Sequence, residues 1–289
     1  MSLSVEKRKD NETKGVKTLL GEPKKAIITL SIPMIIAMSA NTIYNLFDAL
    51  WVSGFGQDLF TDANVSDIGT GALAAVGFVL PFFMMIISIS VGIGVGAGSA
   101  ISRRIGANDK EGADNVAVHS IIITLIVSII FSILFYIFAE EIFILIGAKE
   151  SSDMAISYGR VIFAGGVFLF FSNVAYAILR GEGDAKRAMY AMMFGAILNI
   201  IIDPIFIYTL GLGVAGAAWA TIISISITSI FLCYWLLFKK DTYVTFKFKD
   251  FKFDTKILKD IFRVGLPASF SQLSMSIMML IINIMKCLT

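Results

Sequence analysis

Seven long apolar blocks restrict what this chain can fold into more than any other feature. The chain is 57% hydrophobic, well above the share in a soluble domain. As helices rising about 1.5 Å per residue, all seven blocks are long enough to cross roughly 30 Å of hydrocarbon. No block alternates polar and apolar residues as a β-barrel strand does. We therefore expect an all-α polytopic membrane helix bundle. The predicted spans are residues 26–52, 72–98, 116–139, 155–179, 188–210, 214–238 and 257–285.

Lys and Arg residues concentrate on alternate connections between these blocks. Residues 1–25 hold seven of them and contain no short apolar core with a cleavage site, which excludes a signal peptide. The first and fifth connections hold none, and the third holds only Lys149. By the positive-inside rule, we expect a multi-pass protein of the cell membrane with a cytoplasmic N-terminus. The basic residues of the second, fourth and sixth connections are Arg103, Arg104, Lys110, Arg180, Lys186, Arg187, Lys239, Lys240, Lys247, Lys249, Lys252 and Lys256.

The last apolar block repeats part of the first. Placing Pro33 on Pro267, an offset of 234, aligns the two proline-containing runs and several apolar positions after them. We expect a cytoplasmic segment at 1–25, a six-helix N-lobe at 26–238, a basic cytoplasmic linker at 239–256, and at 257–289 a seventh helix that begins a truncated second lobe. Transporters built from two such repeats place their sites near the bilayer midplane.

Two carboxylates inside apolar blocks are the strongest functional signal. Burying such an acid in a bilayer costs about 2.5 to 3.5 kcal/mol on insertion scales, so Asp48 and Asp203 require an explanation. Tyr44 precedes the first acid by four residues and Asn199 precedes the second by four, so each pair shares a helix face. This pattern indicates a proton or Na⁺ site. The alternative, that each Asp caps a helix end near an interface, remains open.

Other motifs favour structural interpretations. Gly92, Gly94, Gly96 and Gly98 follow no strand, which favours close helix packing over a nucleotide-binding loop. For His119, the only histidine, a structural role is favoured over proton relay. Two cysteines support neither a disulfide framework nor a metal site. No nucleophile–base pair or phosphate loop occurs, and the net charge is only +2. We expect no enzyme, no cofactor beyond a coupling ion and no nucleic-acid partner.

Three segments resemble the multidrug and toxic compound extrusion (MATE) family of transporters. They are Ser102-Arg-Arg-Ile-Gly106-Ala-Asn-Asp-Lys110, Ala177-Ile-Leu-Arg180-Gly181-Glu-Gly183-Asp184-Ala-Lys186 and Gly213-Val-Ala-Gly216-Ala-Ala-Trp219-Ala-Thr221. The resemblance implies a twelve-helix transporter of two lobes that exports amphipathic, often cationic compounds in exchange for Na⁺ or H⁺. It implies an ion site at Asp48, Asn199, Asp203 and Thr221, with Tyr44 and Pro33 as supporting residues.

The chain departs from the family pattern in two respects. It ends after the seventh helix, and Ile282 stands where the repeat would place a second copy of Asp48. The leading hypothesis is a cation-coupled multidrug efflux antiporter or its N-terminal half. One alternative is a truncated, non-transporting membrane protein or a subunit that needs a separate C-lobe. A lipid-linked oligosaccharide flippase is less favoured, because the first six helices hold almost no cation beyond Arg160.

Overall fold

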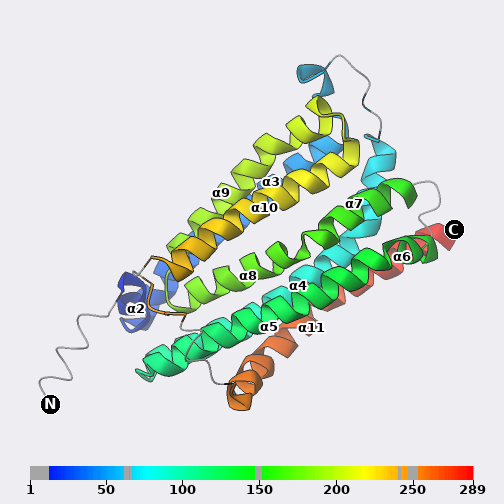
Figure 1. Cartoon of the computed structure of the whole chain (residues 1–289). Coiled ribbons are helices and arrows are strands. Elements are labelled where there is room, and N and C mark those ends of the chain that lie inside the picture. The colour runs from blue at the N-terminus through cyan, green and yellow to red at the C-terminus, as the bar shows by residue number, and fades with distance from the viewer. Residues whose placement is uncertain are drawn as a thin grey trace, which may run out of the picture.

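The computed structural model describes residues 13–61, 65, 67–146, 152–239, 242–246 and 253–288 (Figure 1). These residues form helices joined by turns, and no strand occurs among them. The helices are α2 (Lys14–Leu19), α3 (Pro23–Val52), η1 (Gln57–Leu59), α4 (Thr70–Gly106), α5 (Lys110–Ile137), α6 (Ala139–Leu145), α7 (Ser152–Ala164), α8 (Gly166–Gly181), α9 (Ala185–Pro204), η3 (Ile205–Thr209), α10 (Gly213–Leu237) and α11 (Thr255–Leu288). The predicted all-α bundle is confirmed.

Each predicted span corresponds to a helix or helix pair of the structure, with one correction. Six helices among the described residues are long and apolar enough to cross a membrane, and α7 with α8 makes a seventh span bent by 50°. The fourth span, predicted as one helix over 155–179, is therefore two. The break lies at Gly165, where a Cβ atom would come within 2.3 Å of the Ile222 side chain on α10. Gly165 and Gly166 supply the flexible pair that such a sharp bend needs.

Helix α4 is central because it packs closely on two neighbours. One glycine face of α4 meets α11, and a Cβ on Gly96 would lie 2.2 Å from the Ile261 carbonyl oxygen. The other face meets α8, where a Cβ on Gly98 would lie 3.0 Å from the Ala177 carbonyl oxygen. Small residues let helix backbones approach in this way without side-chain clashes. The packing role predicted for these glycines is confirmed.

A polar contact holds α11 to α4 near their other ends. Asn283 Nδ2 on α11 donates a hydrogen bond of 2.9 Å to the carbonyl oxygen of Gly77. That carbonyl has no helical partner, because residue 81, four positions later, is a proline inside α4 and lacks an N–H. Asn283 therefore satisfies a carbonyl that the α4 sequence itself leaves free.

We expect Asn283→Leu to lower the free energy of unfolding by about 1 kcal/mol, because it leaves the Gly77 carbonyl unpaired. In a Pro81→Ala background, the N–H of residue 81 pairs with that carbonyl, so the same substitution should cost much less. A double-mutant cycle measured by unfolding in detergent checks this. Equal costs in the two backgrounds would show that Asn283 does not act through the Gly77 carbonyl.

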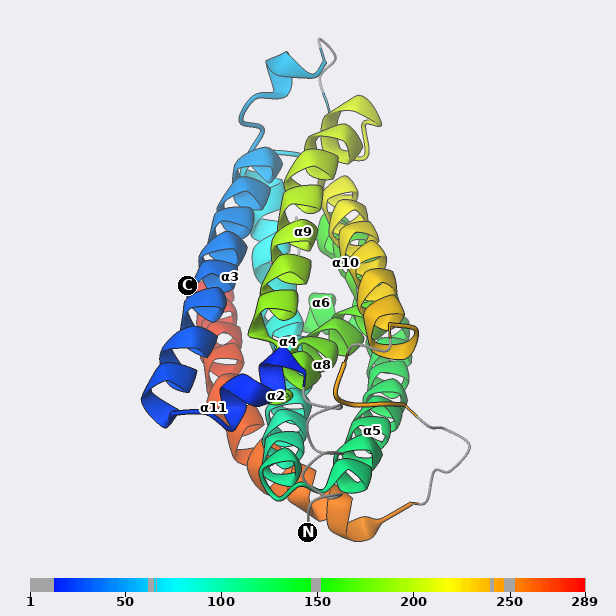
Figure 2. The same cartoon turned by 90° about the vertical axis from the view of Figure 1, so that its left-hand side faces the viewer.

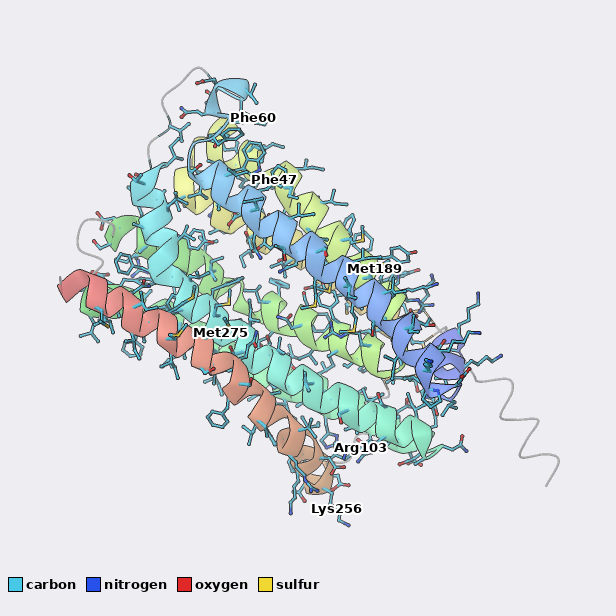
Figure 3. All side chains as sticks on the ribbon, turned by 180° about the vertical axis from the view of Figure 1, so that it is seen from behind. Phe47, Phe60, Arg103, Met189, Lys256 and Met275 are labelled. Atoms are coloured by element: carbon cyan, nitrogen blue, oxygen red, sulfur yellow. The ribbon has the colours of Figure 1, made fainter. Side chains whose placement is uncertain are left out.

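Two parts of the segment between α10 and α11 are held by hydrogen bonds at the basic end of the bundle, the end that carries Arg103 and Lys256 (Figure 3). The backbone N–H of Val244 donates to the Glu182 carboxylate at 3.0 Å. The backbone N–H of Asp254 donates to His119 Nε2 at 3.0 Å, while Nδ1 lies 2.8 Å from the Asn115 carbonyl. The structural role predicted for His119 is confirmed. Parts of the predicted linker, residues 240–241 and 247–252, lie outside the described residues.

Glu182 makes the stability of this end of the bundle depend on pH. The residue is 2% exposed in the turn between α8 and α9. Burial raises the pKa of its carboxyl to about 7; Asp184 adds to the rise, while the Val244 and Tyr243 amides and Arg187 oppose it. A folded-state pKa above the unfolded value means that the folded state holds its proton longer.

We expect the unfolding midpoint to fall by a few °C as pH rises from about 4.5 to 7, with the loss complete above the folded-state pKa. Across that window the unfolded chain releases the Glu182 proton while the folded chain retains it. Thermal unfolding in detergent at a series of pH values measures the effect. Glu182→Gln should flatten the slope, and an unchanged slope in that variant would refute the assignment to Glu182.

Candidate ion-binding site

The core of the candidate site is built by α9 and α10. Asn199 and Asp203 lie four residues apart on α9 and are almost fully buried, at 3% and 0% exposure. Asn199 Nδ2 donates to Asp203 Oδ1 at 3.0 Å and is 3.3 Å from Thr221 Oγ1 on α10. One amide group thus links the acid on α9 to the hydroxyl on α10. Of the four predicted ion-site residues, these hydrogen bonds join three.

Asp48 and Tyr44 approach this core from α3. Figure 2 shows α3, α9 and α10 side by side. The Asp48 and Asp203 carboxylates interact electrostatically, and the Tyr44 hydroxyl lies beside the Thr221 side chain. Both α3 residues are partly buried. The structure therefore brings the two membrane acids, which are 155 positions apart in sequence, into one cluster.

Three acceptor oxygens in this cluster have no hydrogen-bond partner among the described residues. They are Asp48 Oδ1, Asn199 Oδ1 and Asp203 Oδ2, and each atom is buried. Buried polar atoms are normally paired, and a buried, unpaired carboxylate is especially costly. A proton or a small cation would satisfy several of these oxygens together. The cluster contains no histidine or cysteine, and carboxylate, amide and hydroxyl oxygens are ligands for hard cations.

Two further residues, one at the cluster and one a helical turn from Thr221, were not singled out from the sequence. Tyr158 on α7 is buried and interacts electrostatically with both acids and with Tyr44. Ser224 lies one helical turn after Thr221 on α10, and its buried hydroxyl has no partner among the described residues. The three-residue spacing could have revealed Ser224, since it places both hydroxyls on one helix face. No local pattern marks Tyr158, because its contacts with the acids are long-range.

A π-helix fixes the end of α9 next to the site. Pro204 ends α9, and η3 follows with its Leu210 N–H bonded to the Ile205 carbonyl at 2.9 Å. Tyr208 in η3 is 2% exposed and donates to carbonyl oxygens of Trp51 and Phe55 at the end of α3. This clamp ties α3 to the continuation of α9. It thereby sets the separation between the helices that carry the two acids.

Pro33, predicted to support the site, lies far from it. The residue is buried within α3, which continues as one helix from Pro23 to Val52. Fifteen positions separate Pro33 from Asp48, or about 22 Å along a helix. Any effect of Pro33 on the site must therefore act through α3.

Comparison with known proteins supports a transporter. The MatE family model matches residues 33–205. Multidrug export protein MepA of Staphylococcus saprophyticus is 28% identical over 261 residues, which are 90% of this chain and 55% of that protein. MepA of Staphylococcus aureus strain RF122 matches with the same identity and coverage.

Solved structures of transporters share the fold. A MOP superfamily transporter from Pyrococcus furiosus, described as having a binding pocket of reverse polarity that suggests a different function, is 55% identical with a TM-score of 0.85. The match covers 92% of this chain and 56% of that one. The outward-facing structure of a multidrug resistance MATE family transporter gives the same values. The chain thus spans about half the length of the relatives it matches.

Proposed function

This chain belongs to the MatE family of membrane transporters, and from that membership we propose that it provides the ion-binding lobe of a cation-coupled multidrug efflux antiporter. The coupling ion is Na⁺ or H⁺, and the transported compounds are small, amphipathic and often cationic. The protein lies in the cell membrane with its N-terminus in the cytoplasm. The names of the MepA relatives support multidrug export, and the alternating basic connections support this orientation.

The observation that carries the ion-coupling proposal is the group of three unpaired oxygens at Asp48, Asn199 and Asp203. Two neighbouring carboxylates on different helices repel each other when both are ionised, and a bound cation or proton relieves that repulsion. Ion binding therefore favours an arrangement with α3 held against α9, and ion release favours their separation. In an antiporter, this difference would bias the cleft between inward and outward access.

Substrate efflux with an imposed Na⁺ or proton gradient tests the proposal. Asp48→Asn and Asp203→Asn should each abolish ion-dependent efflux while the protein remains in the membrane. Asp153→Asn is the matched control, because this acid on α7 is exposed, whereas Asp48 and Asp203 are partly or fully buried. Unchanged efflux in both site variants would refute the proposal.

A second candidate is a subunit that acts only with a separate second lobe; this chain spans about half the length of its relatives. Comparing efflux by the 289-residue chain alone with efflux after co-expression of residues from a relative's second lobe distinguishes the two. Efflux that depends on Asp203 but appears only on co-expression would support the subunit. Substantial efflux by the chain alone would exclude it.

A further inference from the structure

An open groove of about 220 Å³, called the Arg180 cavity below, lies between α4 and α8 and shares no lining residue with the acid cluster. Its walls are α4 residues from Gly94 to Ser102 and α8 residues from Ala177 to Gly181. The close crossing of these helices explains the space: a Cβ on Gly181 would lie 2.8 Å from the Gly98 Cα, so backbones meet directly. Where neither helix carries a large side chain, the groove beside the crossing stays unfilled.

Of the described residues that line this cavity, only Arg180 is charged. It lies in the last turn of α8 and is partly buried. Among the described residues its guanidinium has no hydrogen bond and no ion pair. The other partly buried arginines are paired with carboxylates: Arg104 with Asp260, Arg160 with Glu140 and Arg187 with Asp184.

The other polar side chain in the cavity cannot neutralise this charge. Ser102 Oγ already donates within the crossing, to the carbonyl oxygens of Gly181 at 2.7 Å and Gly98 at 2.9 Å. Arg180 is therefore a cation with unused donors facing a space of ligand size. A guanidinium presents several N–H groups in a planar fork that matches the oxygens of a phosphate.

We propose that the Arg180 cavity binds the phosphate of an anionic lipid headgroup. The cavity lies near the basic end of the bundle, where Arg103 on α4 is exposed (Figure 3). Helix ends lie at headgroup depth, and basic pockets between membrane helices on such a face recognise anionic headgroups. Free phosphate offers the same chemistry without the acyl chains.

Short-chain phosphatidylglycerol, titrated into the purified chain in a neutral detergent, tests the proposal by the shift in unfolding midpoint and by native mass spectrometry. Two variants target the cavity in different ways. Arg180→Gln removes the charge, and Val95→Phe fills the space from the exposed side of α4. Each should weaken binding about tenfold or more. Arg180→Lys should bind with intermediate affinity, because it keeps the charge but loses the fork.

Arg103→Gln is the matched control, since this exposed arginine follows Ser102 but does not line the cavity. Its affinity for phosphatidylglycerol should stay within about threefold of the wild type. Inorganic phosphate that stabilises the chain with the same dependence on Arg180 and Val95 would support phosphate recognition with free phosphate as the ligand. Normal phosphatidylglycerol affinity in both cavity variants, or an equal loss in Arg103→Gln, would overturn the proposal. None of these measurements requires transport.

Discussion

Asparagine in place of Asp203 is expected to abolish stabilisation of the chain by the proposed coupling ion. A ligand that binds only the folded state stabilises it by about 2.7 kcal/mol at a concentration 100 times its dissociation constant. Asp203 is fully buried and supplies one of the two charges in the cluster. Its removal should eliminate the rise of the unfolding midpoint with Na⁺. If H⁺ is the ion, the removal of Asp203 should eliminate the part of the rise in unfolding midpoint with falling pH that depends on this cluster.

The same variant should be more stable than the wild type in Na⁺-free buffer at alkaline pH, where neither ion neutralises the two acids. Asparagine has nearly the shape of aspartate but carries no charge to repel Asp48, so the cost of an unpaired buried carboxylate disappears. Thermal unfolding of both proteins in detergent, with and without Na⁺ and across pH, separates these effects. Asp153→Asn should retain the wild-type ion response. An Asp203→Asn protein that keeps the full response would place the ion elsewhere.

Features encoded locally could be predicted from the sequence. The seven spans follow from apolar blocks, and the Asn199–Asp203 pair follows from a four-residue helical spacing. The bend at Gly165 could not be located, because it depends on how closely Ile222 of α10 approaches. A glycine alone does not show which neighbour it accommodates.

The rest of the site depends on long-range packing. Thr221 was predicted as a site residue only from the family resemblance. Tyr158 was not predicted, because nothing near it in sequence indicates its contact with two acids on other helices. Glu182 was likewise unremarkable in a turn rich in charge. Its burial arises from segments distant in the chain, including Val244, whose backbone N–H donates a hydrogen bond to the Glu182 carboxylate. Sequence spacing can place residues on one helix face, but it does not determine which faces meet.

The acid cluster and the attachment of α11 depend on different helix contacts. Helix α3 packs chiefly on α9, whereas α11 packs along α4. The proposed ion binding at the α3–α9 contact and the attachment of α11 therefore involve different helix pairs. The two glycine faces of α4 join α11 to α8 and through it to the remaining helices. Weakening the α4–α11 face should then detach α11 without altering the acid cluster.

Gly96→Ala tests this expectation and should lower the free energy of unfolding by about 2 to 3 kcal/mol. The added Cβ would lie 2.2 Å from the Ile261 carbonyl oxygen, which belongs to a helix backbone and cannot rotate away. The two helices must therefore separate, and the Arg104–Asp260 ion pair at 3.0 Å should weaken with them. Unfolding in detergent measures the loss of stability.

Gly106→Ala is the matched control on the same helix. Among the described residues, no atom outside the adjoining helix backbone lies within 4 Å of a Cβ at that position, so alanine should leave stability unchanged or raise it by up to about 1 kcal/mol through its higher helix propensity. The ion response through Asp203 should survive in both variants, because neither glycine contacts α9. Destabilisation of equal size at Gly106 would show that the loss in Gly96→Ala does not arise from the contact with Ile261. Lost ion response in Gly96→Ala alone would instead show that the attachment of α11 and the acid cluster are coupled through α4.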